Sequence, residues 1–169
     1  FNFPTDRIIF EITESEQLVE KEHLKGIIGE YQRQRFKTAI DDFGAGYSGL
    51  NLLAEFQPDI IKLDMALVRG IDTDPVRQAI VQGILGVCRV LNIEVIAEGV
   101  ETLGELRLLK GLGIYLFQGY LFARPAFEAL PEVDWPASSE ADSALVEPLS
   151  GLPALLASRR SALGVVAVQ

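Results

Sequence analysis

Short apolar runs recur five times along the chain, and each run ends in polar or acidic residues. The runs are Arg7–Thr13, Lys37–Asp42, Asp59–Asp64, Glu94–Glu98 and Ile114–Gly119. They are rich in β-branched or aromatic residues and nearly continuous in hydrophobicity, which is typical of strands covered on both faces. The pattern therefore predicts five buried β-strands.

Helical patterns separate these runs, at about Glu16–Arg35, Gly49–Phe56, Asp74–Leu91 and Leu103–Leu112. The third pattern begins with Asp74 in the capping position and Pro75 in the first turn, which is a favourable helix start. Strands that alternate with helices indicate βα units around a parallel sheet. The sequence therefore predicts an α/β fold.

Two features favour a barrel over an open dinucleotide-binding sheet. No G-x-G-x-x-G motif follows a strand, and charged residues gather at the carboxyl ends of the strands, where barrel enzymes place their active sites. A complete (βα)8 barrel needs about 250 residues, so we expect about five βα units of an incomplete barrel, without its N-terminal strands. We assign residues 1–135 to this domain. Residues 136–169 are expected to form a low-order tail rich in Ala, Ser, Leu and Pro, with a short helix near Leu152–Leu163 and no chemistry of its own.

The composition narrows the classes of protein and the kinds of site. The chain has 169 residues, a net charge of −9 and an ordinary globular content of 49% hydrophobic residues. The single cysteine, Cys88, excludes a disulfide framework and argues against a thiolate zinc site. The single histidine, His23, argues against histidine triads. We therefore expect a cytoplasmic location. The acidic charge argues against binding of duplex nucleic acid, but not against a phosphate ligand held through metal ions.

Acidic residues recur at successive strand ends and predict a metal site. Crowded carboxylates repel one another unless cations bind between them, and hard oxygen ligands favour Mg²⁺ or Mn²⁺. In the adjacent pair Asp41–Asp42, one carboxylate can bridge two ions while the other serves one. Two ions roughly 3.5–4 Å apart are a common apparatus for phosphodiester hydrolysis, and Lys62 can orient the water or offset developing charge. The strand ends supply Glu11, Asp41, Asp42, Lys62, Asp64, Glu98 and Gln118, with Glu14 and Glu101 a few residues beyond.

Five segments of the chain resemble the EAL domain family in their order and spacing, over about residues 1–130. They are FEITES (10–15), DDFGAGYSGL (41–50), PDIIKLD (58–64), VIAEGVET (95–102) and FQGYLFARP (117–125). The resemblance implies a modified TIM barrel. It also implies hydrolysis of the second messenger cyclic di-GMP to linear pGpG with two Mg²⁺ or Mn²⁺ ions.

The same resemblance implies roles for individual residues. The implied metal ligands are Glu11, Asp41, Asp42 and Glu98, with Asp41 bridging both ions. Implied catalytic residues are Lys62, which contacts the water, Glu98, as a general base or ligand of a metal-bound water, and Gln118, which orders the water and metal shell. Implied support comes from Glu14, which anchors the loop Asp42–Gly49, and from Glu101. The implied substrate-binding residues are Asp64, Gly119 and Pro125, the last as part of the wall on the guanine side.

The chain also departs from the family pattern. The family's E-x-L signature and strand asparagine are absent from these 169 residues and are expected upstream of Phe1. We therefore expect the parent protein to be active and the 169-residue chain alone to be inactive or unstable. Two alternatives stay open, namely a non-catalytic cyclic di-GMP receptor and a fragment without function of its own. The resemblance further implies a homodimer through Gly49–Met65, and it allows an upstream sensor domain or membrane anchor.

Overall fold

The computed structural model describes residues 4–13, 21–46, 49–129, 131–134 and 164–165, and every structural statement below concerns these residues. The strands are β1 (Ile9–Thr13), β2 (Lys37–Phe43), β3 (Ile60–Leu63), β4 (Glu94–Ala97), β5 (Leu116–Phe117) and β6 (Gly164–Val165). The helices are α1 (Lys21–Arg33), α2 (Gly49–Glu55), α3 (Met65–Val68), α4 (Pro75–Leu91) and α5 (Leu103–Gly111). Two 3₁₀ turns, η1 (Thr5–Arg7) and η3 (Ile71–Thr73), complete the set.

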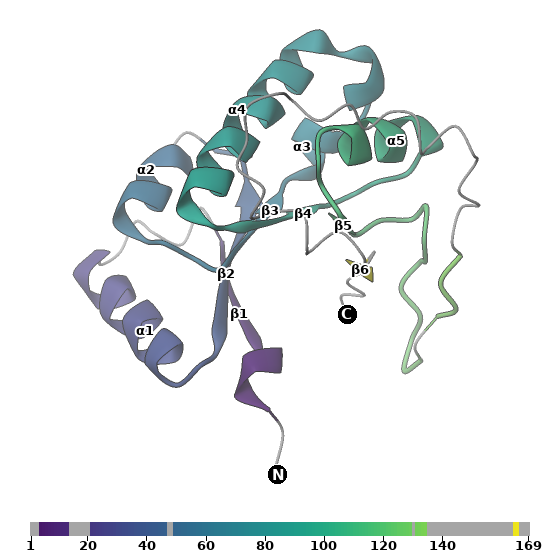
Figure 1. The fold of residues 1–169 in the computed structure, drawn as a ribbon. Helices are drawn as coiled ribbons and strands as arrows, with labels where there is room; N and C mark the ends of the chain where they lie inside the picture. Colours follow the sequence, from purple (N-terminus) through teal and green to yellow (C-terminus); the bar gives the residue numbers. More distant parts are fainter. Residues whose placement is uncertain (1–3, 14–20, 47–48, 130, 135–163, 166–169) are drawn as a thin grey trace, which may run out of the picture.

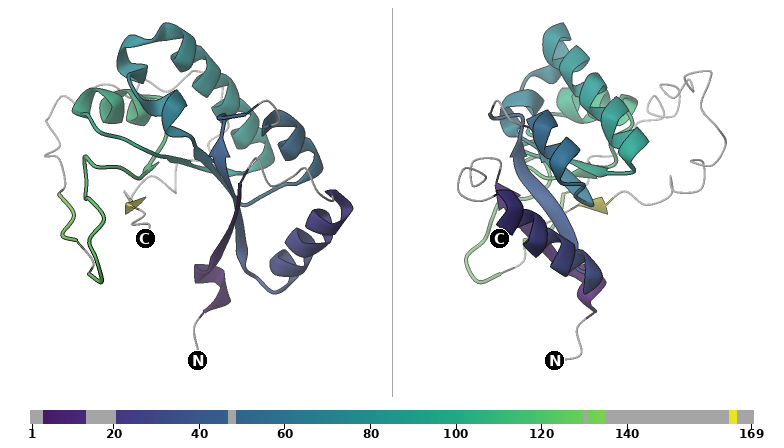
Figure 2. Two further views of the ribbon diagram at one scale, coloured as in Figure 1. Left: turned by 180° about the vertical axis from the view of Figure 1, so that it is seen from behind. Right: turned by 90° about the vertical axis from the view of Figure 1, so that its left-hand side faces the viewer.

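The six strands form one sheet in sequence order, β1 to β6, and every neighbouring pair is parallel. Figure 1 shows the helices gathered on one side of this strongly twisted sheet, and Figure 2 shows the same arrangement from behind and from the side. The predicted α/β class with alternating strands and helices is therefore confirmed.

Some elements differ from those predicted. Helix α3 forms directly after β3 because the Asp64 carboxylate accepts a hydrogen bond from the Ala66 N–H, at 2.7 Å, and caps the first turn. The strand β5 is shorter than its apolar run. Within the segment expected to be a tail, Gly164–Val165 pairs with β5. The helix expected near 152–163 and the proposed boundary at residue 135 lie outside the described residues and stay predictions.

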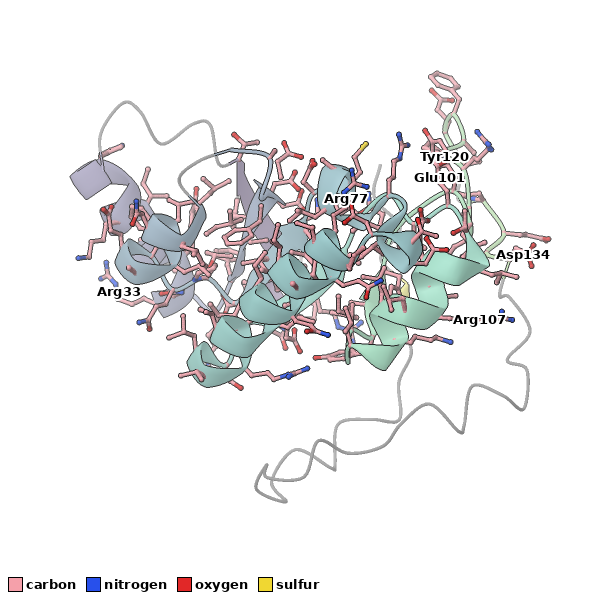
Figure 3. All side chains as sticks on the ribbon, turned by 90° about the horizontal axis from the view of Figure 1, so that it is seen from above. Arg33, Arg77, Glu101, Arg107, Tyr120 and Asp134 are labelled. Carbon is pink, nitrogen blue, oxygen red and sulfur yellow. The ribbon has the colours of Figure 1, made fainter. Side chains whose placement is uncertain are left out.

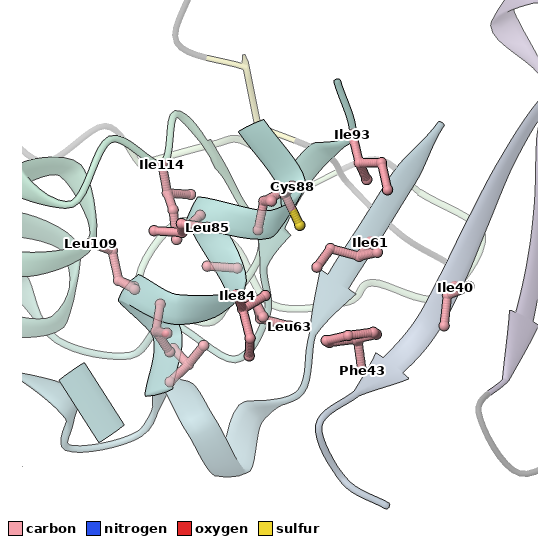
Figure 4. Close-up of a cluster of buried hydrophobic side chains, with 14 of the residues drawn as sticks. Ile40, Phe43, Ile61, Leu63, Ile84, Leu85, Cys88, Ile93, Leu109 and Ile114 are labelled. Atoms are coloured by element: carbon pink, nitrogen blue, oxygen red, sulfur yellow. The ribbon is translucent and has the colours of Figure 1, made fainter. Parts of the chain in front are cut away.

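The main core lies between the sheet and the helices, where alternate strand residues meet the buried face of α4. In Figure 4, Ile40, Phe43, Ile61 and Leu63 of the sheet face Ile84, Leu85 and Cys88 of α4. Burial raises the pKa of the Cys88 thiol to about 11, so this cysteine is a core side chain and not a nucleophile. Among the described residues, no helix has the length and apolar character needed to cross a membrane.

The opposite face of the sheet begins with a small apolar layer and ends in polar residues. Successive side chains of a strand point to opposite faces, so residues two positions apart share a face. The apolar layer consists of Ala39, Ile60, Ile96 and Leu116. Two residues further along the same strands stand Asp41, Lys62, Glu98 and Gln118. The pleat therefore carries these four polar side chains to one face, at the carboxyl edge of the sheet.

Helix α2 offers a matched test of the core. Leu53 is 1% exposed and lies in the core, whereas Leu50, one turn earlier, is 61% exposed. We expect Leu53→Ala to lower the free energy of unfolding by about 3 kcal/mol, because it leaves a cavity. Leu50→Ala should cost less than about 1 kcal/mol. Urea unfolding of both variants checks this, and equal losses would contradict the assignment of the buried helix face.

Candidate metal centre

The Lys62 ammonium on β3 lies at the centre of the carboxyl edge and contacts three carboxylates. Its Nζ lies 2.8 Å from Glu98 Oε1, 2.9 Å from Asp41 Oδ1 and 3.1 Å from Glu11 Oε2. The lysine side chain is only 3% exposed. Acids on β1, on β2 and directly after β4 therefore meet at one buried cation.

These contacts keep Lys62 charged. Burial by itself would lower the pKa of the Lys62 ammonium, but its hydrogen bonds with Glu98, Asp41 and Glu11 outweigh burial and raise that pKa above its ordinary value. A lysine held in this way cannot accept a proton near neutral pH. It can donate hydrogen bonds and hold the three carboxylates at fixed distances.

A backbone irregularity at the end of β2 turns two adjacent acids toward the same region. The pairing of β2 with β3 shifts register between Ile40 and Phe43, and Asp42 adopts a left-handed backbone conformation with φ of +54°. In a regular strand Asp41 and Asp42 would point to opposite faces. Here ligand atoms of Asp41, Asp42 and Glu98 all lie within 4.8 Å of one another.

This group of three carboxylates suits a hard divalent cation. Mg²⁺ takes oxygen ligands at about 2.0–2.1 Å, so two of its ligands lie at most about 4 Å apart, and small side-chain movements would close the group around an ion. The Lys62 ammonium contacts Glu11, Asp41 and Glu98 and balances only one of their charges when all three are ionised. The remaining negative charge favours a bound cation.

Gln118 supplies a second observation that points to a ligand. The Gln118 Oε1 atom is buried and has no hydrogen-bond partner among the described residues. The Gln118 N–H donates to Ala97 O at 2.9 Å, which places this residue beside the end of β4 that carries Glu98. A buried acceptor without a partner is costly, and a cation-bound water or a donor on a ligand would satisfy it.

The Glu98 carboxyl of the cluster has a raised pKa. Burial raises the pKa of its carboxyl, the contact with Lys62 lowers it, and repulsion from Asp41 and Glu11 raises it again, so the pKa lies above its ordinary value. A carboxylate of this kind is suited to accept a proton from a nearby water.

Other residues predicted for the site are not members of the three-carboxylate group. Glu11 reaches the cluster through Lys62 and is not among the three carboxylates within 4.8 Å. Asp64 caps α3, and Glu101 forms an ion pair with Arg69. Figure 3 labels Glu101, which lies with Tyr120 toward one edge of the molecule, whereas Arg107 lies on the other side of α5.

The loop that follows β5 carries two more predicted residues. A side-chain carbon at Gly119 would lie 2.1 Å from Val100 O, so the close approach of two backbones requires glycine there. Pro125 is exposed in the same loop, next to Arg124, whose guanidinium stacks on the Tyr120 ring at 4.6 Å. Glu14, and residues 47–48 of the loop it was expected to anchor, lie outside the described residues. The implied substrate and anchoring roles stay predictions.

The sequence reasoning missed Glu105, a buried acid that is 4% exposed. Its carboxylate accepts hydrogen bonds from the N–H groups of Gly70, Glu101 and Thr102, at 2.8, 2.9 and 3.0 Å. The Thr102 hydroxyl accepts from the Glu105 N–H, which completes a capping box at the start of α5. The spacing T-x-x-E before a helix is the signal that could have revealed it.

Comparisons with known proteins assign the family. The model of the EAL domain matches residues 2–125. The antirepressor BluF of Escherichia coli K12, described as regulated by blue light and temperature, is 40% identical over 131 residues, which cover 78% of this chain and 32% of BluF. The cyclic di-GMP phosphodiesterase PdeR of the same organism is 43% identical over 124 residues, 73% of this chain and 19% of PdeR. The chain belongs to the EAL domain family.

Solved structures agree with this assignment. A standalone versatile EAL protein from Vibrio cholerae O395, in its c-di-GMP-bound form, superposes with a TM-score of 0.75 and 52% identity, over 78% of this chain and 56% of that protein. The manganese and cyclic di-GMP complex of Klebsiella pneumoniae BlrP1 at pH 6 gives a TM-score of 0.76 and 44% identity, over 81% and 35%. The chain thus spans about a third of BluF and about half of the Vibrio protein, and the predicted EAL-type fold is confirmed.

We expect Lys62→Met to destabilise the metal-free protein by about 3 kcal/mol, because removing the cation leaves three partly buried carboxylates in mutual repulsion. Lys37→Met is the matched control, since Lys37 pairs with one acid, Glu94, at 3.5 Å and its side chain is 42% exposed. That variant should lose less than about 1 kcal/mol. Urea unfolding with a chelator present measures both, and equal losses would rule out a central role for Lys62.

The Glu105 carboxyl predicts a pH dependence of stability. Burial would raise its pKa, but the three backbone N–H donors outweigh burial and hold the pKa below the ordinary 4.5. A depressed pKa means that the stabilisation is complete above that ordinary value and is lost as the pH falls through the lower value in the folded state. Glu105→Gln removes this titration. Its urea midpoint should therefore fall less than that of the unaltered protein between about pH 5 and pH 3, and parallel curves would contradict the assignment.

Proposed function

We propose that this chain contributes the Lys62-centred part of the active site of a phosphodiesterase, which hydrolyses cyclic di-GMP to linear pGpG. The observation that carries the proposal is the group of Asp41, Asp42 and Glu98 within 4.8 Å, held beside a buried ammonium. PdeR is named a cyclic di-GMP phosphodiesterase, and the BlrP1 complex contains manganese with cyclic di-GMP. Both names support the proposed substrate.

The residues present fit two divalent ions, Mg²⁺ or Mn²⁺. Asp41, Asp42 and Glu98 would hold them, and Glu11 would join from β1. When bound, such ions supply Lewis acidity, which neutralises phosphoryl oxygens and makes water a better nucleophile. The unsatisfied Gln118 Oε1 would accept a hydrogen bond from water in the same region.

Glu98 and Lys62 then have different roles in proton transfer. Glu98, with its raised pKa, accepts the proton of the attacking water. The water oxygen attacks phosphorus, the P–O3′ bond breaks, and the 3′ oxygen leaves as a hydroxyl after it gains a proton from solvent. Lys62 stays protonated throughout, orients the water and holds Glu98 and Asp41 in place.

The remaining partners follow the implied family roles. Asp64, Gly119 and Pro125 would contact the dinucleotide from the loops that follow β3 and β5. A homodimer through Gly49–Met65 is supported by the exposure of Leu50 and Met65 at the two ends of this segment. The proposed setting is cytoplasmic, as the substrate and the reduced cysteine suggest, and an upstream sensor domain would supply the input signal.

A second candidate is a non-catalytic receptor for cyclic di-GMP. It is favoured by BluF, a relative named as an antirepressor and not as a phosphodiesterase. The same carboxylate cluster would then bind the ligand through ions without productive water attack. Turnover, and not binding, separates the two candidates.

The test uses the full-length gene product with cyclic di-GMP and Mn²⁺ or Mg²⁺, and it measures pGpG by chromatography. We expect turnover that a chelator abolishes. Asp41→Asn should lower kcat/KM more than about 100-fold, because it removes a carboxylate that would hold the ions and that contacts Lys62. Asp6→Asn, which alters an exposed acid outside the cluster, is the control and should keep full activity.

Each result decides between the two candidates. Metal-dependent turnover that is lost in Asp41→Asn supports the phosphodiesterase. Binding of cyclic di-GMP in calorimetry without any turnover supports the receptor. Turnover that survives a chelator, or that Asp41→Asn leaves intact, would refute the proposed role of the cluster.

A further inference from the structure

The buried carboxylate of Glu105 joins two loops that lie far from it in the sequence. Its Oε1 accepts from the N–H of Gly70, in the turn that follows α3. Its Oε2 accepts from the N–H groups of Glu101 and Thr102, in the loop that follows β4. One side chain on α5 therefore connects the segments that extend from the two central strands.

Both of these loops begin next to residues of the candidate metal centre. Lys62 lies on β3, and the chain continues from it through Asp64 and α3 to Gly70. Glu98 directly follows β4, and Glu101 comes three residues later. The Glu98 N–H also donates to Leu63 O, at 3.2 Å, so the two strands are still paired where the loops begin. A shift of either loop would thus move Glu98 relative to Lys62.

The segment that follows β3 packs closely against the segment that follows β4, up to the first turn of α5. A side-chain carbon at Gly99 would lie 2.6 Å from Met65 Cβ. One at Gly104 would lie 2.3 Å from the Asp72 carboxylate. Real carbon atoms do not approach this closely, so the glycines permit a contact that the Glu105 hydrogen bonds then hold. The same β4 loop also binds the loop after β5, since Val100 N–H donates to Gln118 O at 3.1 Å.

A second connection between the two loops is an ion pair, and it is weaker because it is exposed to solvent. Arg69 pairs with Glu101, but their side chains are 52% and 41% exposed. Exposed ion pairs contribute little, because water screens them. Buried hydrogen bonds from backbone N–H groups to a carboxylate are stronger and cost more to break. The Glu105 carboxylate is accordingly the main link.

We propose that Glu105 is a positioning residue of the metal centre, whose carboxylate fixes the loops after β3 and β4 and so sets the place of Glu98 beside Lys62 and Asp41. Glu105 touches neither ion nor substrate in this role. The inference rests on the proposed function only in taking Asp41, Asp42 and Glu98 to be a site that binds metal ions. The fixing of the loops can be measured without metal.

The test compares variants that separate the loop link from the helix cap. Glu105→Ala removes every acceptor, and Glu105→Met does the same with an apolar side chain of similar length that suits a buried position. Glu105→Gln keeps one acceptor oxygen. Thr102→Ala is the control, because it removes the hydroxyl that caps α5 but leaves all three backbone bonds to Glu105.

Two measurements are made on the full-length protein at a temperature where every variant is folded. Hydrogen exchange in the metal-free state reports on the amides of Gly70, Glu101 and Thr102, and calorimetric titration with Mn²⁺ reports on the metal centre. We expect Glu105→Ala and Glu105→Met to speed exchange at these amides and to weaken Mn²⁺ binding at least about tenfold. Glu105→Gln should recover part of both losses, and Thr102→Ala should bind Mn²⁺ within about twofold of the unaltered protein.

The outcomes distinguish failure of the proposed function from failure of the positioning role of Glu105. If the unaltered protein does not bind Mn²⁺, the proposed function fails, and the exchange data alone decide whether Glu105 fixes the loops. If Mn²⁺ binds with unchanged affinity in Glu105→Met, or if Thr102→Ala loses as much affinity as Glu105→Ala, the positioning role is overturned. A variant that fails to fold is replaced in the comparison by the other apolar variant.

Discussion

The carboxyl edge of this protein depends on one buried ammonium that faces three carboxylates. Lys62 extends from β3, which lies in the sheet between β2 and β4, so it can reach acids on both neighbours and on β1. Without that cation, the acids of these strands could not lie so close together in a partly buried space. The distances from Nζ to Glu98, Asp41 and Glu11 are therefore what makes a metal centre at this edge feasible.

The sheet and its loops keep that arrangement in place. A layer of Ala39, Ile60, Ile96 and Leu116 supports the polar residues from below. Above them, the loops after β3, β4 and β5 approach one another through glycines and are held by backbone hydrogen bonds. Loops that carry catalytic residues are ordinarily the least stable parts of a fold. Here a buried acid, Glu105, gives two of them a fixed spacing.

Membership of the EAL domain family settles the fold but not the use of the site. Relatives of this chain include a named phosphodiesterase and a named antirepressor, and one fold can serve both kinds of task because function resides in particular side chains. The raised pKa of Glu98 and the protonated state of Lys62 give this chain a base and a fixed cation beside a group of ligands. That combination is what the proposed hydrolysis would use.

The sequence by itself determined the strands, the parallel α/β class and the acids at the strand ends, because each depends on local periodicity and on residue type. It predicted that Asp41 and Asp42 serve one site but not how the two converge, since that depends on a shift of register against β3 and a left-handed residue. Nor did it reveal that Glu101, three residues after Glu98, pairs with Arg69. Such choices follow from contacts between strands and loops distant in sequence. Only the tertiary structure decides them.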